Sequence, residues 1–574
     1  MTAGRSQHIV VFGFKGVARR IVKQLAKVHP RVVVVDPQLA DSEIDTLRRY
    51  GVQYVQGYGQ SMEVLESVDV RNARAAICAT NDDLHNIEIA LLVRELSAEV
   101  KVIVQMANGN VGRALERVTQ PSRVLEVADL ASTAFVESAA DRPTHAITLG
   151  RRRFYITNVV QPRTATLRSV WGDAAPIAVR AVASGITVTT PSRAREAQAG
   201  DTVTLLATAE ELHAAGYGDR LQAPGPRRRH AWTRIREGLG AMLDAIERPF
   251  RIALGVTAGL GLISVLILTT SFVKPDGSRM GLLDAMYFTT ETIATVGFGD
   301  FYFSGQAAPL RAWAIVMMLL GATLVYTASA FLTNALVSRR LAQSIGRQRV
   351  TAMRDHIVVI GLGAVGSKVA LELQAAGYDV VVIDSGSGQR FVSQMRAARI
   401  PVLIGDPTLP ETHREAGVHR AAGVAVLSND DLLNIETGLA VKAVVGERKV
   451  PVALRVFGRN LARVIDSSLE IGTTRSVAEL SAPWFVGAAV GLDVIGTFYV
   501  DHAPFLAARI SVRRDDRLHD RAINHLSEST RFVAIDRSDG SFEYPLQRDA
   551  VFRAGDSAYV VGRFEDLLDL MQLH

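Results

Sequence analysis

The sequence contains a single cysteine, Cys78, so no disulfide can form within the chain. Cys78 lies in an apolar stretch, where a buried structural thiol is the expected state. Because disulfides belong to oxidising compartments, we expect the parts of the chain outside a membrane to be cytoplasmic. Residues 1–13 run directly into a strand-like pattern, and we expect no signal peptide.

The sequence also lacks an EF-hand-like run and any cluster of histidine and cysteine, so no metal site of those kinds can be placed. Charged residues make up only 21% of the 574 residues, against 48% hydrophobic ones. This mixture is typical of a soluble protein that carries a small membrane part. At this length we expect about three or four domains.

Charge is missing altogether from two long apolar stretches, 252–273 and 312–337. A helix that crosses a membrane needs about 20 apolar residues. The alternative, a buried helix of a soluble core, is rarely free of charge over such a length. We therefore predict two transmembrane helices.

Lysine and arginine flank these stretches unequally. The run RRRHAWTRIR (227–236) precedes the first stretch, whereas the connecting loop, 274–311, contains only Lys274, Arg279 and Arg311. Arg248 and Arg251 also precede the first stretch, and the second stretch is followed by Arg339, Arg340, Arg347 and Arg349. Because positive residues favour the cytoplasmic side, we predict a multi-pass protein of the plasma (inner) membrane with both termini cytoplasmic. This explains the net charge of +6 better than nucleic acid does, and we expect no nucleic-acid partner.

The connecting loop contains a further apolar segment, GLLDAMYFTTETIA (281–294), which is compatible with a helix but too short to cross. The irregular sequence TVGFGD (295–300) follows it at once. A short helix and irregular backbone at membrane depth are tolerated only where they are buried in protein or line a water-filled cavity. The alternative is a glycine-rich extracellular turn, but the flanking spans favour a re-entrant pore loop.

TVGFGD resembles the selectivity filter of potassium channels, whose usual core is TVGYG. In that family four such loops meet on an axis, and their backbone carbonyls replace the water around K⁺. The positions that the resemblance assigns to this role are Thr295, Val296, Gly297 and Phe298. Gly297 and Gly299 can take backbone angles closed to other residues, which lets the carbonyls point inward. Phe298 replaces the usual tyrosine; it keeps a ring to pack behind the filter but lacks the hydroxyl.

Three more residues match positions of the same family. Glu291 and Asp300 flank the filter, from the short helix and from the outer mouth. Two carboxyl groups held close together can share a proton; the alternative is a pair of solvated charges at the mouth. Gly321, in the second predicted span, either lets the inner helix bend as a gating hinge or serves close helix packing.

The sequence repeats itself on both sides of the predicted pore. HIVVFGFKGVARRIVKQL begins at His8 and HIVVIGLGAVGSKVALEL at His356, an offset of 356 − 8 = 348 that also relates NDDLHNIE (81–88) to NDDLLNIE (429–436). An offset that stays constant from residues 8–88 to residues 356–436 means that one fold is used twice. Each copy alternates strands and helices, with a glycine-bearing first turn and a second strand that ends in aspartate. This is a Rossmann pattern.

A smaller strand-rich lobe follows each Rossmann pattern, with AGDTVTLLA (199–207) in the first copy and AGDSAYVVG (554–562) in the second. Each half thus resembles an RCK domain (regulator of potassium conductance), which is related to the KTN/TrkA-type nucleotide-binding domains. The resemblance implies that such domains pair and build a cytoplasmic ring that pulls on the pore helices. The expected fold class is a membrane α-helical two-span pore module flanked by two α/β Rossmann-like RCK domains, each with a small α+β C-terminal lobe.

We expect six segments. In chain order they are the first Rossmann lobe (6–122), the first linker helices and C-terminal lobe (123–222), a basic linker (223–250), the pore domain (251–340), the second Rossmann lobe (353–472) and the second linker helices and C-terminal lobe (473–574). Within the basic linker, residues 231–247 form either an amphipathic helix at the lipid headgroups or a solvated helix.

A Rossmann nucleotide site needs glycines at the first turn, for close approach of the backbone, and an acid for the ribose hydroxyls. The second copy has GLGAVG (361–366), Asp384 and GDPT (405–408), the last resembling a family motif near the adenosine, and Arg455 matches an arginine on the phosphate side. The candidate ligand-binding residues are Gly361, Leu362, Gly363, Ala364, Val365, Gly366, Asp384, Ser385, Gly405, Asp406, Thr408, Asn429, Asp430 and Arg455. Asp384 suits a ribose 2′-hydroxyl and disfavours a 2′-phosphate, so we predict NAD(H), ATP or ADP rather than NADP. The alternative is a Rossmann core that binds nothing.

The first copy departs from this pattern, with GFKGVA (13–18) in place of GLGAVG and GYGQ (57–60) in place of GDPT. Gln105 aligns with Arg455, although the aspartate is kept. We therefore predict that the first copy is a structural partner in the ring with a degraded or altered site. The alternative is that Lys15 contributes its charge to a phosphate.

Together these features predict a homotetrameric K⁺ channel in the lipid bilayer, not an enzyme, gated by a ring of eight RCK domains that binds NAD(H) or ATP/ADP. Divalent cations regulate other members of the family, but no cation site can be placed. One alternative is a nucleotide-sensing regulatory subunit of a separate K⁺ transport system, against which the filter argues. The other is a membrane-anchored NAD-dependent dehydrogenase, for which no acid–base residue is evident.

Overall fold

The structure is a computed structural model. It describes residues 8–107, 112, 123–141, 144–218, 248–345, 350, 353–386, 389–469, 471–514, 516, 518–523, 529–547 and 549–571. The chain forms two units, Met1–Arg227 together with Arg354–His574, and Arg228–Met353. Most of the predicted basic linker (223–250), including 231–247, lies outside the described residues, and the predicted domain boundaries stay predictions.

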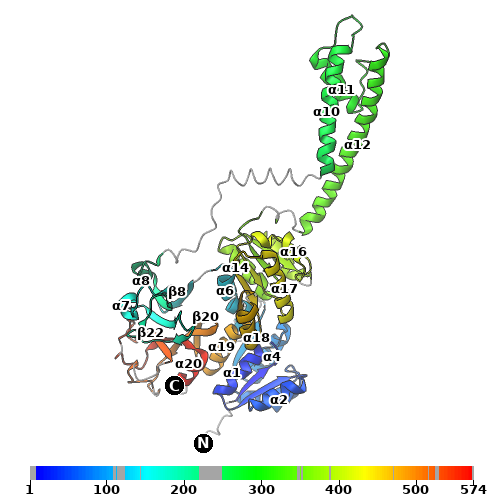
Figure 1. The fold of residues 1–574 in the computed structure, drawn as a ribbon. Coiled ribbons are helices and arrows are strands. Elements are labelled where there is room, and N and C mark those ends of the chain that lie inside the picture. Colours follow the sequence, from blue (N-terminus) through cyan, green and yellow to red (C-terminus); the bar gives the residue numbers. More distant parts are fainter. Residues whose placement is uncertain are drawn as a thin grey trace. The chain divides into compact units, whose positions relative to one another are not determined.

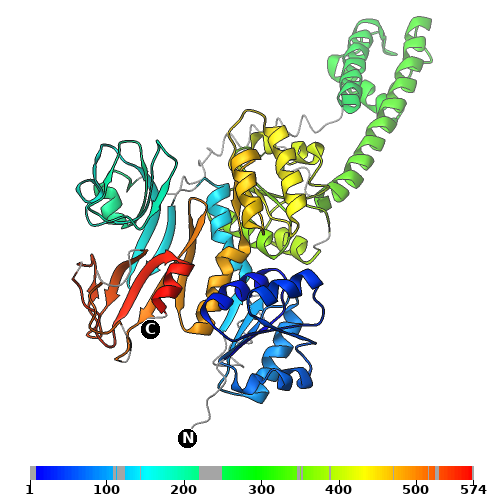
Figure 2. The same cartoon turned by 60° about the horizontal axis from the view of Figure 1, so that its bottom comes forward.

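The first unit contains two six-stranded parallel sheets of the same topology, ordered β3-β2-β1-β4-β5-β6 and β16-β15-β14-β17-β18-β19 (Figures 1 and 2). The elements of the first copy are β1 (Ile9–Phe12), α1 (Val17–Val28), β2 (Val32–Asp36), α2 (Asp41–Arg49), β3 (Gln53–Gln56), α3 (Met62–Ser67), β4 (Ala75–Cys78), α4 (Asp83–Leu96), β5 (Lys101–Met106), β6 (Arg123–Glu126) and the linker helix α6 (Val127–Ala139). Those of the second copy are β14 (Ile357–Ile360), α14 (Ala364–Ala375), β15 (Val380–Asp384), α15 (Gln389–Ala397), β16 (Val402–Ile404), α16 (Pro410–Glu415), β17 (Gly423–Val426), α17 (Asp431–Val445), β18 (Val452–Arg455), α18 (Arg459–Val464), β19 (Thr473–Arg475) and the linker helix α19 (Val477–Val490). This strand order confirms the Rossmann fold predicted for each copy.

Strand β1 shows why these strands are apolar throughout. Its side chains alternate between two hydrophobic clusters: Ile9 and Val11 pack with residues of α1, and Val10 and Phe12 with residues of α4. A parallel strand covered on both faces has no solvated side, so every position is hydrophobic.

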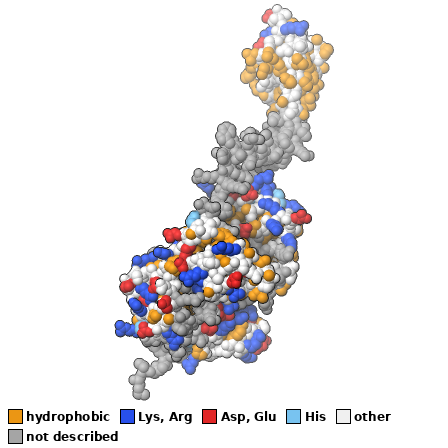
Figure 3. Space-filling model, turned by 60° about the vertical axis from the view of Figure 1, so that its left-hand side comes forward, with side chains coloured by type: hydrophobic (Ala, Val, Ile, Leu, Met, Phe, Trp, Pro, Cys, Tyr) orange, Lys and Arg blue, Asp and Glu red, His pale blue; other side chains and the backbone are white. Residues whose placement is uncertain are grey.

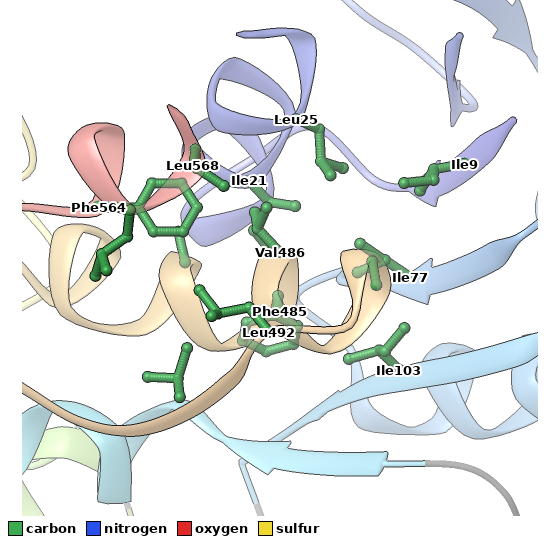
Figure 4. Close-up of a cluster of buried hydrophobic side chains, with 14 of the residues drawn as sticks. Ile9, Ile21, Leu25, Ile77, Ile103, Phe485, Val486, Leu492, Phe564 and Leu568 are labelled. Atoms are coloured by element: carbon green, nitrogen blue, oxygen red, sulfur yellow. The ribbon is translucent and has the colours of Figure 1, made fainter. Parts of the chain in front are cut away.

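After each sheet a linker helix leaves its own copy and packs on the other, α6 against α14 and α19 against α1. Figure 4 shows Phe485 and Val486 of α19 beside Ile21 and Leu25 of α1. All four side chains are fully buried, and burying one side chain of this kind stabilises by about 1.5–3 kcal/mol. The exchange therefore joins the two copies in a shared hydrophobic core.

Where α6 packs on the second copy, the two backbones approach so closely that a glycine is required. A Cβ added to Gly423, at the start of β17, would lie 1.8 Å from the carbonyl oxygen of Ala139 at the end of α6. On the α19 side, the Arg74 side chain instead donates a hydrogen bond of 2.7 Å to the carbonyl oxygen of Val490. The two copies are thus fitted to each other through backbone atoms as well as apolar side chains.

Each copy ends in a small lobe built on a five-stranded antiparallel sheet, ordered β11-β10-β13-β8-β7 and β20-β21-β24-β22-β23. The first lobe consists of β7 (Thr144–Leu149), β8 (Arg152–Val160), β9 (Ala165–Thr166), α7 (Leu167–Trp171), β10 (Ala175–Arg180), β11 (Thr187–Thr189), β12 (Glu196–Ala197), β13 (Thr202–Thr208) and α8 (Ala209–Ala214). The second consists of β20 (Asp493–Val500), β21 (Ala503–Ser511), β22 (Thr530–Asp536), β23 (Phe542–Glu543), β24 (Ser557–Arg563) and α20 (Phe564–Met571). The lobes contact each other: the Tyr544 hydroxyl lies 2.8 Å from both carboxylate oxygens of Glu211.

The second unit contains α10 (Arg248–Ser271), the short α11 (Leu282–Ile293) and the long α12 (Ala308–Ile345). Among the described residues, one helical stretch, Ala308–Thr327, is long and apolar enough to cross a membrane, and the apolar stretch Gly255–Ser271 of α10 is shorter. Large side chains of this unit such as Leu262 and Leu319 are mostly exposed. Figure 3 shows that hydrophobic side chains cover much of the visible surface of the helical unit. A surface of this kind requires lipid or further protein to cover it.

Candidate pore and ligand site

The segment after α11 alternates in backbone conformation. Thr295, Gly297 and Gly299 have positive φ angles of 58°, 60° and 88°, whereas Val296 and Phe298 between them do not. Successive carbonyls of an ordinary extended chain point in alternating directions, so alternating the sign of φ turns them toward one side. A Cβ on Gly297 or Gly299 would meet nothing within 4 Å, so the glycines are needed for the backbone angle and not for space.

The filter side chains have little cover within one chain. Val296 is 52% exposed and Phe298 is 69% exposed. The predicted packing of the Phe298 ring behind the filter therefore needs neighbouring copies of the chain.

The two acids beside the filter have different surroundings. Asp300 accepts a hydrogen bond of 3.0 Å from the hydroxyl of Tyr287 in α11. Glu291 is buried, and its Oε2 has no partner among the described residues. In the described part of one chain no hydrogen bond joins Glu291 to Asp300, so their shared proton stays a prediction.

An aromatic cluster that the sequence analysis missed holds the segment after the filter. It consists of Phe272 just after α10, Phe288 from α11, and Phe301 and Phe303, with ring centroids 4.9–6.3 Å apart. Several of these pairs are edge to face, an arrangement that aromatic quadrupoles favour. The repeated phenylalanines in GFGDFYF were the available signal.

Gly321 lies where α12 passes the end of α11. A Cβ there would lie 3.1 Å from the Cα of Ile293, and α12 continues through this position without interruption. Close helix packing accounts for the glycine, and the gating hinge stays a prediction.

In the first unit a cleft of 1010 Å³ opens between the two Rossmann copies, and both copies line it. Of the predicted ligand-binding residues, Ala364, Val365, Asn429 and Arg455 are in its wall, whereas Asp384 and the other candidates are not. The first copy contributes Gly16, Arg19, Arg20, Lys23, Asn81, Asp83 and Gln105. The charged residues of α1 were missed from the sequence, although they follow the glycine turn at positions that share a helix face.

Arg455 is a buried cation in this cleft. Its Nη1 donates a hydrogen bond of 2.6 Å to Asn429 Oδ1, and its guanidinium lies 4.8 Å from the centre of the Phe457 ring. Burial lowers the pKa of Arg455 to about 10, opposed by the charge of Asp431. Its Nε has no partner among the described residues. A buried cation with an unused N–H group fits an anionic ligand such as a phosphate.

In the first turn of the second copy, each of the three glycines is explained by a different structural feature. Gly361 has a φ of 94°, and a Cβ on Gly366 would lie only 2.0 Å from the carbonyl oxygen of Gly361. Gly363 caps α14 and has open space at its Cβ position, which is the approach that a phosphate at a helix N-terminus needs.

The equivalent turn of the first copy is built differently. Helix α14 begins at Ala364, which corresponds to Gly16 (364 − 348 = 16), but α1 begins one position later, at Val17. Ala18 replaces the third glycine, and its Cβ cannot approach the first glycine's carbonyl as Gly366 does. The sequence difference between the copies therefore changes the backbone at the helix start.

The aspartate that ends the second strand has a structural role in both copies. Asp384 accepts hydrogen bonds from the backbone of Leu362, at 3.0 Å, and of Gly386, at 2.8 Å. Asp36 in the first copy accepts equivalent bonds from Phe14 and Gln38, both at 3.1 Å. Retention of this acid in the first copy is thus explained without a ligand.

The GDPT loop is held in shape by its own side chains. The backbone N–H and the hydroxyl of Thr408 both donate to Asp406, at 2.8 and 2.7 Å, and these bonds lower the pKa of Asp406. The buried His413 donates from Nε2 to the carbonyl oxygen of Pro407, at 2.7 Å. The loop is therefore preformed, although it does not line the cleft.

Comparison with known protein families identifies the parts of the chain. The TrkA-N domain family matches residues 9–125 and 357–469, and the ion channel family matches residues 252–338 between them. The chain carries two TrkA-N domains and an ion channel domain. This is the arrangement that the filter motif and the repeat predicted, and it makes the chain a membrane protein.

Several relatives of this channel-domain protein are known. Potassium channel protein 1 of Methanocaldococcus jannaschii is 23% identical over 331 residues, which is 54% of this chain and 95% of that protein. The voltage-gated potassium channel Kch of Escherichia coli is 25% identical over 176 residues, 30% of this chain and 42% of Kch. An uncharacterized protein of Methanothermus fervidus is 25% identical over 167 residues, 27% of this chain and 25% of that protein. Except in the first of these, the match spans less than half of the relative's length.

Solved structures share the fold. The GsuK channel bound to NAD matches with a TM-score of 0.51 at 16% identity, covering 100% of this chain and 79% of that one. A second structure of the GsuK channel has a TM-score of 0.50 at the same identity and coverage. At this identity the likeness shows the fold alone.

Proposed function

We propose that this protein is a K⁺-selective channel of the plasma membrane, controlled by an adenine nucleotide or dinucleotide bound to its TrkA-N domains. The observation that carries the proposal is the backbone of TVGFGD, which alternates in φ directly after a short helix between two long ones. Such a segment offers several carbonyl oxygens to one ion and has no other evident use in an apolar unit. Relatives named as potassium channels support the choice of ion.

Regulation by a nucleotide is supported by the cleft between the TrkA-N domains. Its volume of 1010 Å³ suffices for a dinucleotide, and its wall includes Arg455, whose buried Nε has no partner among the described residues. The GsuK channel, which shares the fold, is known with NAD bound. NAD(H), ATP and ADP are the proposed ligands, with Arg455 and the start of α14 on the phosphate side. Binding would favour one arrangement of the two domains and so shift the population of open pores.

Assembly as a tetramer is supported by equivalent exposed leucines in the two copies. Leu84 and Leu91 on α4 are 60% and 43% exposed, and Leu432 and Leu439 on α17 are 64% and 44% exposed. They correspond through the repeat (432 − 348 = 84; 439 − 348 = 91), and residues seven apart share a helix face. We assign these faces to a contact between α4 of one chain and α17 of the next. Repeated four times, this contact closes a ring of eight domains around the pore.

The proposal places both termini in the cytoplasm, because lysine and arginine are concentrated outside the connecting loop. In this orientation Tyr287, Asp300 and the aromatic cluster lie at the outer mouth, and the TrkA-N domains are on the side where nucleotides are abundant.

Ion flux into liposomes that contain the purified protein tests the function. We expect uptake of K⁺ and Rb⁺ but hardly any Na⁺, with a rate that changes when NAD(H), ATP or ADP is added. Gly299→Ala should abolish the flux, because a residue with a Cβ is strained at a φ of 88°. Gly305→Ala is the control, since Gly305 lies in the same loop with ordinary φ and open space. Equal Na⁺ and K⁺ flux, or flux indifferent to Gly299→Ala, would overturn the proposal.

A further inference from the structure

A second cavity, of 440 Å³, adjoins the cleft in the first unit. Its walls come from α1, from the β10–β11 hairpin of the first small lobe, from α19, and from the β20–β21 hairpin and the start of α20 in the second small lobe. Arg20 and Glu479 line both cavities. A molecule in this cavity would touch both copies and both small lobes.

Because the two copies are repeats, the α6–α14 crossing can be compared with the α1–α19 crossing beside this cavity. At the crossing of α6 and α14 the polar side chains satisfy one another. Lys368 forms an ion pair with Asp129, and the Ser132 hydroxyl donates a hydrogen bond of 2.7 Å to Glu372 Oε1. Burial raises the pKa of Glu372, and the serine hydroxyl opposes this rise.

At the equivalent crossing of α1 and α19 the same polar layer is incomplete. The ion pair is kept, as Arg20 with Glu479 at 3.6 Å. The serine is not kept, because Ala482 stands at the position of Ser132 (482 − 350 = 132). Gln24 replaces Glu372 (372 − 348 = 24); it lines the cavity and is only 6% exposed, and its Oε1 has no partner among the described residues. A buried amide oxygen costs free energy unless a donor reaches it.

The chemistry of the walls indicates what that donor is. Gln24 Oε1 and the Glu479 carboxylate are acceptors, and the Arg20 guanidinium beside them is a donor, so an ammonium group and a carboxylate are both accommodated. Pro483 and Phe505 supply apolar wall. The charges at the mouth are balanced, since Arg180 lies 4.0 Å from Asp501, and a ligand without net charge is favoured.

We propose that this cavity binds a zwitterionic α-amino acid with an apolar side chain, whose ammonium group donates to Gln24 Oε1. The volume is within the usual range for small-molecule sites, about 300–1,000 Å³. Because the walls belong to both copies and both small lobes, the bound amino acid holds the small lobes against α1 and α19. The site shares Arg20 and Glu479 with the nucleotide cleft but includes Gln24 in place of Arg455, and its occupancy does not depend on whether the protein conducts ions.

Calorimetry on the full chain in detergent micelles tests the site, with L-leucine as the probe. N,N,N-trimethyl-L-leucine is the matched ligand, because it keeps both charges but has no N–H donor. We expect leucine to bind and the trimethyl compound not to bind measurably. Gln24→Leu should weaken leucine binding about ten- to a hundredfold, because it removes an acceptor for a charged donor.

Two further variants keep the proposal falsifiable if Gln24→Leu does not fold. Ala482→Ser restores the hydroxyl that the other crossing has, so it should satisfy Gln24 internally and also weaken leucine binding. Ser132→Ala makes the reverse change at the α6–α14 crossing and should leave leucine binding unchanged. Absence of leucine binding to the unmodified chain at millimolar concentrations would overturn the proposal. So would equal binding of both probes, or unchanged affinity in Ala482→Ser.

Discussion

At the scale of single residues, Arg455 is the proposed contact between the second TrkA-N domain and a ligand. Its charge is held between Asn429 and the Phe457 ring, and its pKa is lowered to about 10 by burial. The side chain remains cationic at neutral pH, but the described surroundings leave its Nε–H group without a partner. An anion in the cleft would both pair the charge and use that group.

We therefore predict that Arg455→Gln weakens the binding of NAD⁺ or ADP about ten- to a hundredfold, measured by calorimetry on the full chain. Arg414→Gln, which removes an exposed arginine from α16, is the control and should leave affinity unchanged. The prediction fails if Arg455→Gln folds with its thermal midpoint retained and binds nucleotide as tightly as before.

At the scale of elements, two neutral histidines hold parts of the second Rossmann domain together. Nε2 of His413 donates to the carbonyl of Pro407 in the GDPT loop, and Nε2 of His356 donates to the carbonyl of Ala416 after α16, at 2.8 Å. Burial lowers the pKa of both imidazoles below the usual 6.5. Below pH 6.5 the unfolded chain takes up protons that the folded chain does not, so stability falls as the pH falls.

We expect the thermal midpoint of the full chain to fall between pH 7.5 and 5.5, followed by circular dichroism. His413→Gln should make this fall shallower while lowering the midpoint at pH 7.5, because it removes the titrating group together with its fit to Pro407. His85→Gln, which changes an exposed histidine of the first copy, should leave the pH dependence as it is. A His413→Gln profile parallel to that of the unmodified chain would contradict the assignment.

At the scale of the whole molecule, the exposed leucines of α4 and α17 are the proposed contact between chains. The only cysteine of the chain is buried, so introduced cysteines can be cross-linked selectively. With Leu84→Cys and Leu432→Cys in one chain, we predict disulfide-linked dimers, trimers and tetramers on non-reducing gels. Either substitution alone should give none, because in the proposed ring α4 faces α17 of the next chain.

Val182→Cys combined with Leu84→Cys is the control, since Val182 is 66% exposed on a small lobe. Cross-linking by Leu84→Cys alone would show a contact of α4 with its own copy and would exclude the proposed ring.

Much of the fold could be read from local pattern. Both Rossmann domains follow from buried strands that alternate with helices, and the equivalence of the copies follows from the constant offset of 348. The positive φ angles of Gly297 and Gly299 were predictable, because glycine has no Cβ to oppose them, whereas that of Thr295 was not. The candidate ligand site was only partly predictable: Arg455 and Asn429 line the cleft, but Asp384 is occupied with its own loop.

By itself, the sequence determined what depends on neighbours along the chain: the periods of strands and helices, the glycine conformations and the apolar spans. Only the tertiary structure decided what depends on residues far apart. It showed that each linker helix packs on the other copy and that α1 of the first copy forms part of the cleft. It also showed that, among the described residues, none gives Gln24 Oε1 the hydrogen bond that Glu372 accepts. In the sequence, Gly423 is an ordinary glycine at the start of a strand. The fold places the carbonyl of Ala139, 284 positions away (423 − 139 = 284), against it. No local pattern encodes such a contact, because its energy arises only when two separately formed surfaces meet.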